Sequence, residues 1–138
     1  REDVLASRMV ADPLSVRDCC LVTDGGGAIV MVRSDRARDF PKAPVYVLGS
    51  AAESCHRQIS QMPDFTVTAA KTSGARAFAI AGVTPADIAV IEIYEAFTIN
   101  TILFLEDLGF CRKGEGSRPR ARSAATLRGC NLAGSNWR

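Results

Sequence analysis

The segment from Ala89 to Leu108 changes from a strand pattern to a helix pattern near its middle. Its first part, Ala89–Ile93, is mostly apolar or β-branched, which is typical of a buried strand. From Thr98 onward, apolar residues recur at helical spacing. A buried strand that runs directly into a helix favours an open α/β sheet, and this junction constrains the fold more than any other feature of the chain.

Three polar residues lie at this junction. Tyr94 and Glu95 follow the predicted strand, and Asn100 lies one turn into the predicted helix. Ligands of open α/β sheets bind beyond the carboxyl ends of the strands, so we expect chemistry here first. Each residue also has a structural alternative. Tyr94 packs at a rim with its hydroxyl satisfied, Glu95 fixes the junction through a hydrogen bond, and Asn100 caps the helix or faces solvent.

The N-terminal piece contains one more strand pattern and one short helix. Gly27–Val32 is a near-continuous apolar run, as expected for a strand buried on both faces. Ser34–Phe40 predicts a short helix with Ser34 as its N-cap, and Glu2–Met9 is helical or irregular. Gly25–Gly27 precedes a strand rather than a helix, so we interpret it as a place of close backbone packing and not as a phosphate-binding loop.

A second piece begins after the prolines that follow Phe40. Val45–Gly49 predicts a strand, and the alanine-rich segment Ala69–Ala81 predicts an amphipathic helix. Gly82 is the expected C-cap of that helix. Thr84–Asp87 predicts a turn or a single helical turn.

Five segments between Glu2 and Gly116 carry a family resemblance. They are Met9–Leu14, Asp18–Ala28, Ala81–Ile88, Tyr94–Phe97 and Leu105–Gly116. In this order they resemble the thiolase superfamily, and most of all the branch of sterol-carrier thiolases and of the lipid-transfer proteins of steroid side-chain breakdown.

The resemblance implies a partial, layered αβα thiolase-like fold of the α/β class. Residues 1–43 are expected to be the end of the N-terminal domain and residues 44–116 the start of the C-terminal domain. Residues 117–138 do not match the motifs that the family carries at this place, and we expect a disordered basic tail, as a change of reading frame would produce. The family's reactive cysteine and its C-terminal histidine and cysteine are also not found here, so we expect the chain to be inactive alone.

The resemblance also assigns roles to residues. Most thiolases have Asn or His at the position of Tyr94, whereas a tyrosine is similar to the lipid-transfer-protein aldolases and implies proton transfer during carbon–carbon cleavage. Cys20 lies in the segment that contacts the pantetheine arm of CoA, although Cys19 and Cys20 also fit the pattern of buried small residues. His56, the sole histidine, borders the substrate entrance in the family. It follows Cys55 directly, and neighbours in a strand face opposite ways, so the two are not a nucleophile and its base.

Composition restricts the remaining classes of protein. The chain is 47% hydrophobic and 23% charged, as in ordinary globular domains. It has no apolar run of the roughly 18 residues that span a membrane and no signal-like N-terminus, so we expect a cytoplasmic protein without membrane contact. Its five cysteines show no metal-binding spacing and are expected to be reduced. We expect no metal and no cofactor, with a CoA thioester as substrate.

Charge is unevenly distributed along the chain. Seven of the 17 basic residues, but one of the 15 acidic residues, lie between Arg112 and Arg138. Nonspecific binding of nucleic acid by this region is the third hypothesis, and the near absence of aromatic residues from the region disfavours it.

The sequence therefore predicts a piece of a thiolase-like acyltransferase or carbon–carbon bond enzyme of lipid or steroid side-chain metabolism. An acyl-CoA or steroid-CoA substrate, a homodimer and a small partner subunit follow from the resemblance. The alternative is a non-catalytic interaction or dimerisation module, which would expose a large apolar patch.

Overall fold

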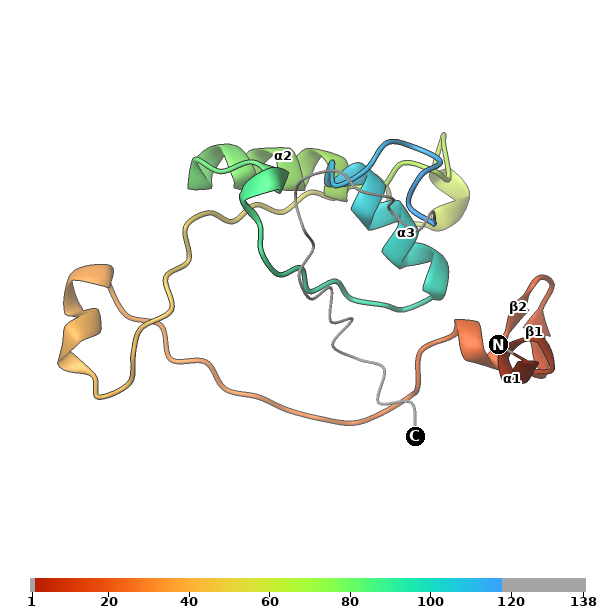
Figure 1. Cartoon of the computed structure of the whole chain (residues 1–138), viewed down its shortest axis with the longest axis horizontal. Coiled ribbons are helices and arrows are strands. Elements are labelled where there is room, and N and C mark those ends of the chain that lie inside the picture. Colours follow the sequence, from red (N-terminus) through yellow and green to blue (C-terminus); the bar gives the residue numbers. More distant parts are fainter. Residues whose placement is uncertain (1, 118–138) are drawn as a thin grey trace.

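A computed structural model describes residues 2–117 of the chain, and Figure 1 shows their course. The helices and strands, with 3₁₀ helices labelled η, are α1 (Glu2–Leu5), β1 (Met9–Ala11), β2 (Leu14–Ser15), η1 (Val16–Asp18), η2 (Ser34–Asp39), η3 (Ile59–Gln61), α2 (Ala70–Ala81), η4 (Pro85–Asp87) and α3 (Thr98–Asp107). The expected disordered tail, apart from Ser117, lies outside the described residues.

The N-terminal unit is a short helix followed by a small hairpin. Strands β1 and β2 pair antiparallel, with Met9 opposite Ser15 and Ala11 opposite Leu14. Ser15 then begins η1 with a capping box, because Asp18 accepts hydrogen bonds from both the backbone N–H and the hydroxyl of Ser15. The prediction of a helical or irregular start agrees with α1 and the turn that follows it.

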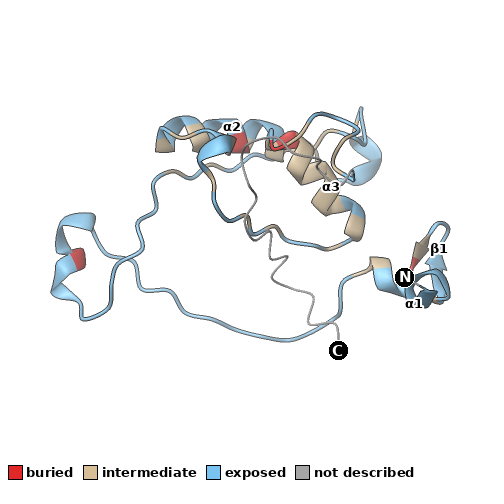
Figure 2. Ribbon diagram, viewed as in Figure 1, coloured by how far each residue is buried: buried red, intermediate tan, exposed pale blue. Residues whose placement is uncertain are grey.

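Helices α2 and α3 lie against each other (Figure 1), and half-buried residues are frequent along both of them (Figure 2). Phe78 and Phe110 meet edge to face, with ring centroids 6.2 Å apart. Gly74 allows the close approach, since a Cβ there would lie 2.3 Å from Cδ2 of Leu108. The two predicted helices are thus confirmed, and Gly82 ends α2 in the left-handed conformation with φ of 69°, as predicted.

The three expected strands, residues 27–32, 45–49 and 89–93, are not strands of a sheet in this structure. Within residues 2–117 the hydrogen-bonded sheet consists of β1 and β2, and the long run before η2 passes alone through solvent (Figure 1). Ile29 is 90% exposed and Val45 is 96% exposed, so the expected burial on both faces is wrong here. An apolar run forms a strand only when a second backbone pairs with it, and the described residues supply no such partner.

Two local predictions also need correction. The short helix at Ser34–Asp39 is a 3₁₀ helix whose N-cap is Arg33, so Ser34 is its first residue rather than its cap. A Cβ on any glycine of Gly25–Gly27 would meet no heavy atom of the described chain within 4 Å, so close packing is wrong for that loop. Close packing occurs instead at Gly49, where a Cβ would lie 2.4 Å from the Ala77 carbonyl oxygen of α2.

The turn at Thr84–Asp87 is confirmed as η4. Thr84 donates from its N–H and its hydroxyl to Asp87, which completes a second capping box. No helix within residues 2–117 has both the length and the apolar character needed to cross a bilayer.

Candidate functional site

The predicted strand-to-helix junction pairs with a segment near the N-terminal end of the described residues. The Cys20 N–H donates to the Ala96 carbonyl at 3.0 Å, and Cys19 forms an antiparallel bridge with Phe97. The segment that carries Cys20 therefore pairs with the segment that carries Tyr94. The structure brings these two sequence-predicted site residues onto neighbouring stretches of backbone.

Asp18 joins the same two segments through its side chain. Its Oδ2 accepts from the N–H and the hydroxyl of Ser15 at 2.8 and 2.9 Å, and its Oδ1 accepts from the Thr98 hydroxyl at 3.0 Å. The backbone N–H and then the hydroxyl of Ser15, followed by Thr98, hold the pKa of Asp18 below its ordinary value. Asp18 is therefore a carboxylate at neutral pH, placed where helix α3 begins.

Sequence reasoning missed Asp18. The available signal was the spacing Ser15-x-x-Asp18, a recognisable capping box, but that pattern indicates only the local turn. The bond from Asp18 to Thr98 spans 80 positions of the chain and has no local signature.

Tyr94 is 79% exposed, and its hydroxyl has no hydrogen-bond partner among residues 2–117. The alternative, that Tyr94 packs at a rim with its hydroxyl satisfied, is therefore wrong within the described residues. Glu95 is also exposed and makes no hydrogen bond with the described residues, so it does not fix the junction; the Ala96 carbonyl does. The phenol of Tyr94 therefore faces solvent, while the backbone two residues further along is held by the bond from Cys20 to Ala96.

Asn100 is half-buried in the first turn of α3, and its backbone N–H donates to the Phe97 carbonyl at 2.9 Å. Cys20 is exposed and Cys19 is half-buried, with the Cys19 thiol donating to the Ser15 carbonyl at 3.4 Å. The expectation that both cysteines are buried is wrong for Cys20. Its thiol lies at the surface beside the junction.

His56 lies apart in the hydrogen-bonding pattern. It is half-buried, and no hydrogen bond or ion pair within residues 2–117 connects it with the paired segments. Nearby, Glu53 pairs with Arg76 of α2 at 3.6 Å, which ties this stretch to the helix pair instead. Its predicted binding role stays a prediction.

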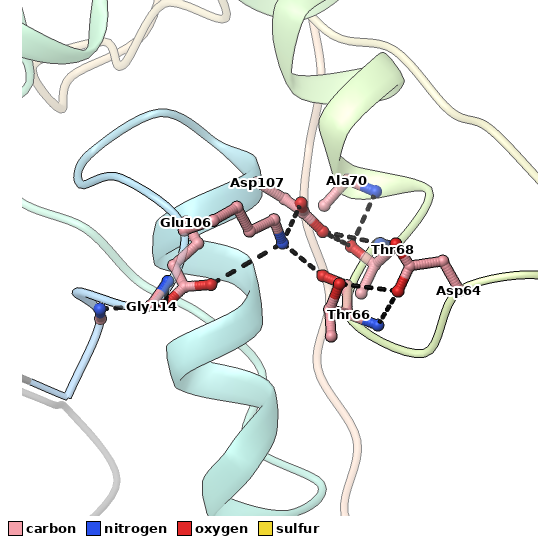
Figure 3. A network of polar contacts seen from close by, with 9 residues as sticks. Asp64, Thr66, Thr68, Ala70, Glu106, Asp107 and Gly114 are labelled. Carbon is pink, nitrogen blue, oxygen red and sulfur yellow. Dashed lines mark hydrogen bonds and ion pairs between the residues drawn. The ribbon is translucent and has the colours of Figure 1, made fainter.

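A second polar cluster lies at the opposite end of α3 (Figure 3). Asp107 Oδ2 accepts from the N–H and the hydroxyl of Thr68, both at 2.7 Å, just before α2 begins. The Lys113 ammonium lies 2.7 Å from Asp107 Oδ1 and 3.8 Å from Glu106, and it also donates to the Thr66 carbonyl. Asp107 Oδ1 has no other partner in the described chain.

The Asp107 side chain is fully buried, which is unusual for a carboxylate. Burial raises the pKa of Asp107, but the hydrogen bonds from Lys113 and Thr68 lower it more, and the result is a pKa below the ordinary 3.8. This ionised, buried group joins the start of α2 to the end of α3. We interpret the cluster as structural, because its charged groups form hydrogen bonds and ion pairs with one another. Within residues 2–117, no three His, Cys, Asp or Glu side chains are grouped as metal ligands.

Comparison with known proteins identifies the family. Residues 51–134, more than half of the chain, match the family model described as "Thiolase C-terminal domain-like". The chain belongs to this family. The match extends beyond Gly116, where the motifs recognised in the sequence end.

Individual relatives agree with this assignment. The chain is 44% identical over 118 residues to an acetyl-CoA acetyltransferase of Methanothermobacter thermautotrophicus, covering 85% of this chain and 31% of the relative. It is 38% identical over 125 residues to the 17-hydroxy-3-oxo-4-pregnene-20-carboxyl-CoA lyase of Mycobacterium tuberculosis, covering 83% of this chain and 31% of the relative. The solved structure of an "Ltp2-ChsH2(DUF35) aldolase" matches with a TM-score of 0.78 at 36% identity, over 83% of this chain and 31% of that chain.

These matches confirm the thiolase superfamily resemblance and the partial α/β thiolase-like fold. The chain spans about a third of the length of these relatives. The domain boundaries at residues 43 and 116 and the roles of individual residues stay predictions.

Proposed function

We propose that the paired segments Asp18–Cys20 and Tyr94–Thr98 form part of a binding site for an acyl-CoA thioester, in a thiolase-like enzyme that makes or breaks a carbon–carbon bond. The observation that carries this proposal is the bond from the Cys20 N–H to the Ala96 carbonyl, which brings the two segments together beside an exposed Tyr94. Both relatives described above act, by their names, on CoA compounds.

Tyr94 is the proposed proton-transfer residue of that site. In retro-aldol cleavage of a β-hydroxyacyl thioester, the β-hydroxyl loses its proton, the carbon–carbon bond breaks, and its electron pair passes to the carbon beside the thioester. In this proposal the exposed Tyr94 hydroxyl hydrogen-bonds to the substrate β-oxygen and relays the released proton to solvent. The tyrosine favours this cleavage over ordinary thiolysis.

The remaining predicted residues take supporting roles. The exposed Cys20 contacts the pantetheine arm, His56 contributes at the entrance, and Glu95 and Asn100 are weaker candidates next to Tyr94. We propose that this chain alone binds the thioester without turning it over, because the family's nucleophilic cysteine and C-terminal histidine are not recognised in its sequence.

A non-catalytic interaction module is the second candidate, and the exposed apolar runs favour it. Val22 is 102% exposed, Ile29 is 90% exposed and Val45 is 96% exposed, and exposed apolar side chains in such runs are what a partner surface would cover. The matched solved structure, by its name, pairs Ltp2 with a second component, ChsH2. By analogy, a small partner subunit or a second copy of this chain would cover these runs.

Binding of acetyl-CoA, a long-chain acyl-CoA and a steroid-CoA to the purified chain, measured by calorimetry together with a turnover assay, separates the two candidates. Tyr94→Phe removes the hydroxyl, and Tyr46→Phe is the matched control because these are the chain's two tyrosines and both are exposed. Binding without turnover is the expected result. Turnover that is lost in Tyr94→Phe alone would contradict the proposed inactivity, and no binding at all would favour the interaction module.

A further inference from the structure

We infer that Asp18 is a positioning residue of the proposed site, whose carboxylate holds the Cys20 and Tyr94 segments in one register. Its effect on ligand binding rests on the proposed function, whereas its effect on the register does not. Nothing in the family resemblance assigns a role to this residue, and the inference rests on its three hydrogen bonds and its place in the pairing.

The Asp18 side chain is first fixed by its own turn. Two bonds from Ser15, both to Oδ2, hold the carboxylate in a single orientation and leave Oδ1 directed at Thr98. Hydrogen bonds to an ionised carboxylate are stronger than those between neutral groups. The carboxylate is therefore a rigid acceptor rather than a surface group that samples many rotamers.

Its partner Thr98 is the first residue of α3. The preceding N-cap, Phe97, offers no side-chain oxygen to the free N–H groups of that helix. A negative charge beside the start of a helix is also favourable, because the helix dipole is positive there. Asp18 thus fixes the point at which the Tyr94 segment turns into α3.

Three successive contacts between the two segments share one antiparallel register. Cys19 faces Phe97, Cys20 bonds to Ala96, and Asp18 bonds to Thr98 one step further along both segments. Within residues 2–117 the pairing goes no further than Cys20 and Ala96, because no bridge or backbone hydrogen bond joins Val22 to Tyr94.

Asp18 is the last residue of η1 and Thr98 is the first residue of α3, so the bond between their side chains lies where the two segments meet these helices. Cys20 lies two residues further along its segment and bonds to Ala96, which is two residues from Tyr94. A register fixed at Asp18 therefore sets how near the exposed Cys20 and Tyr94 lie to each other, as a shared site requires.

Hydrogen exchange of the Cys20 amide tests this directly in the full chain. Asp18→Ala is expected to speed exchange of that amide about tenfold, the loss typical of one or two hydrogen bonds, with amides of α2 changed less than twofold. Thr98→Val, which keeps the shape and removes the hydroxyl, is expected to act like Asp18→Ala, and Thr98→Ser is expected to restore protection. Asp87→Ala is the matched control, because Asp87 makes the same capping box with Thr84 away from the junction.

The affinity for the best acyl-CoA of the binding assay is the second readout. Asp18→Ala and Thr98→Val are expected to weaken it about tenfold, Thr98→Ser is expected to recover most of the affinity lost in Thr98→Val, and Asp87→Ala is expected to leave it within twofold. If the chain binds no acyl-CoA but the exchange results hold, the proposed function fails and the role of Asp18 in setting the register stands. Unchanged Cys20 exchange in Asp18→Ala, or equal losses in Asp87→Ala, would overturn the inference.

Discussion

Replacement of Asp107 by alanine tests the energetics of the α2–α3 pair. The change removes a fully buried carboxylate that accepts two hydrogen bonds of 2.7 Å from Thr68 and one ion pair from Lys113. It leaves the Thr68 donors and the ammonium without their main partner. We expect the two helices to separate more readily.

The magnitude follows from these contacts. A hydrogen bond to a charged acceptor contributes about 1.5–3 kcal/mol, so the two from Thr68 set an upper limit of roughly 6 kcal/mol. Lys113 is 41% exposed, and solvent screening limits its contribution to at most about 1 kcal/mol. Removal of the carboxylate also relieves the cost of burying a charge, so we expect a net loss of about 3 kcal/mol.

Native-state hydrogen exchange measures this loss locally. A change of about 3 kcal/mol corresponds to a roughly hundredfold fall in the protection of amides in α2 and α3, since each 1.4 kcal/mol is about tenfold. Asp87→Ala removes an equivalent pair of bonds to Thr84 from an exposed turn, so its effect is expected to stay within η4. If Asp107→Ala leaves the protection of α2 within twofold of the original, the structural role assigned to Asp107 is wrong.

Two further predictions concern the same unit. Because the pKa of Asp107 is lowered in the folded chain, its contribution to stability is fully present above the unfolded pKa of about 3.9. That contribution is lost as the pH falls through the folded pKa. The stability of Asp107→Asn, measured by circular dichroism during acid unfolding, is therefore expected to depend less on pH in this range than the stability of the original chain. Gly49→Ala places a methyl group 2.4 Å from the Ala77 carbonyl oxygen, a backbone atom that cannot rotate away, so the 45–49 segment is expected to detach from α2 at a cost of about 1–3 kcal/mol. Limited proteolysis should then cut near residue 49 faster than in Gly26→Ala, which meets open space, and equal rates would refute the contact.

Local features of the sequence predicted the helical elements well. The apolar spacing of Ala69–Ala81, the glycine that follows it and the Thr84-x-x-Asp87 pattern are each complete within a few residues, and all three form as expected. The strands could not be predicted in the same way. Residues 27–32 have the composition of a buried strand, but pairing depends on a second backbone that local sequence does not specify.

For the candidate site too, local sequence predicted individual residues but not the long-range contacts between them. Cys20 was predicted through a segment that resembles a family, whereas Tyr94 was predicted from its place after an apolar run and then from the same resemblance; the family is confirmed. That Cys20 and Tyr94 lie on paired segments, with Asp18 bonded to Thr98 at one end of the pairing, depends on contacts across as many as 80 positions. Asp107 gave no signal at all, since an aspartate near the end of a helix usually faces solvent.

Hydrogen exchange of the full chain with and without saturating acyl-CoA is the decisive test of the proposed site. Added thioester is expected to slow exchange in residues 18–20 and in residues 94–98 together and to leave α2 unchanged. If the thioester slows exchange in neither of these segments, or slows it only in the exposed run at residues 27–32, the proposal that the paired segments form the acyl-CoA site is wrong.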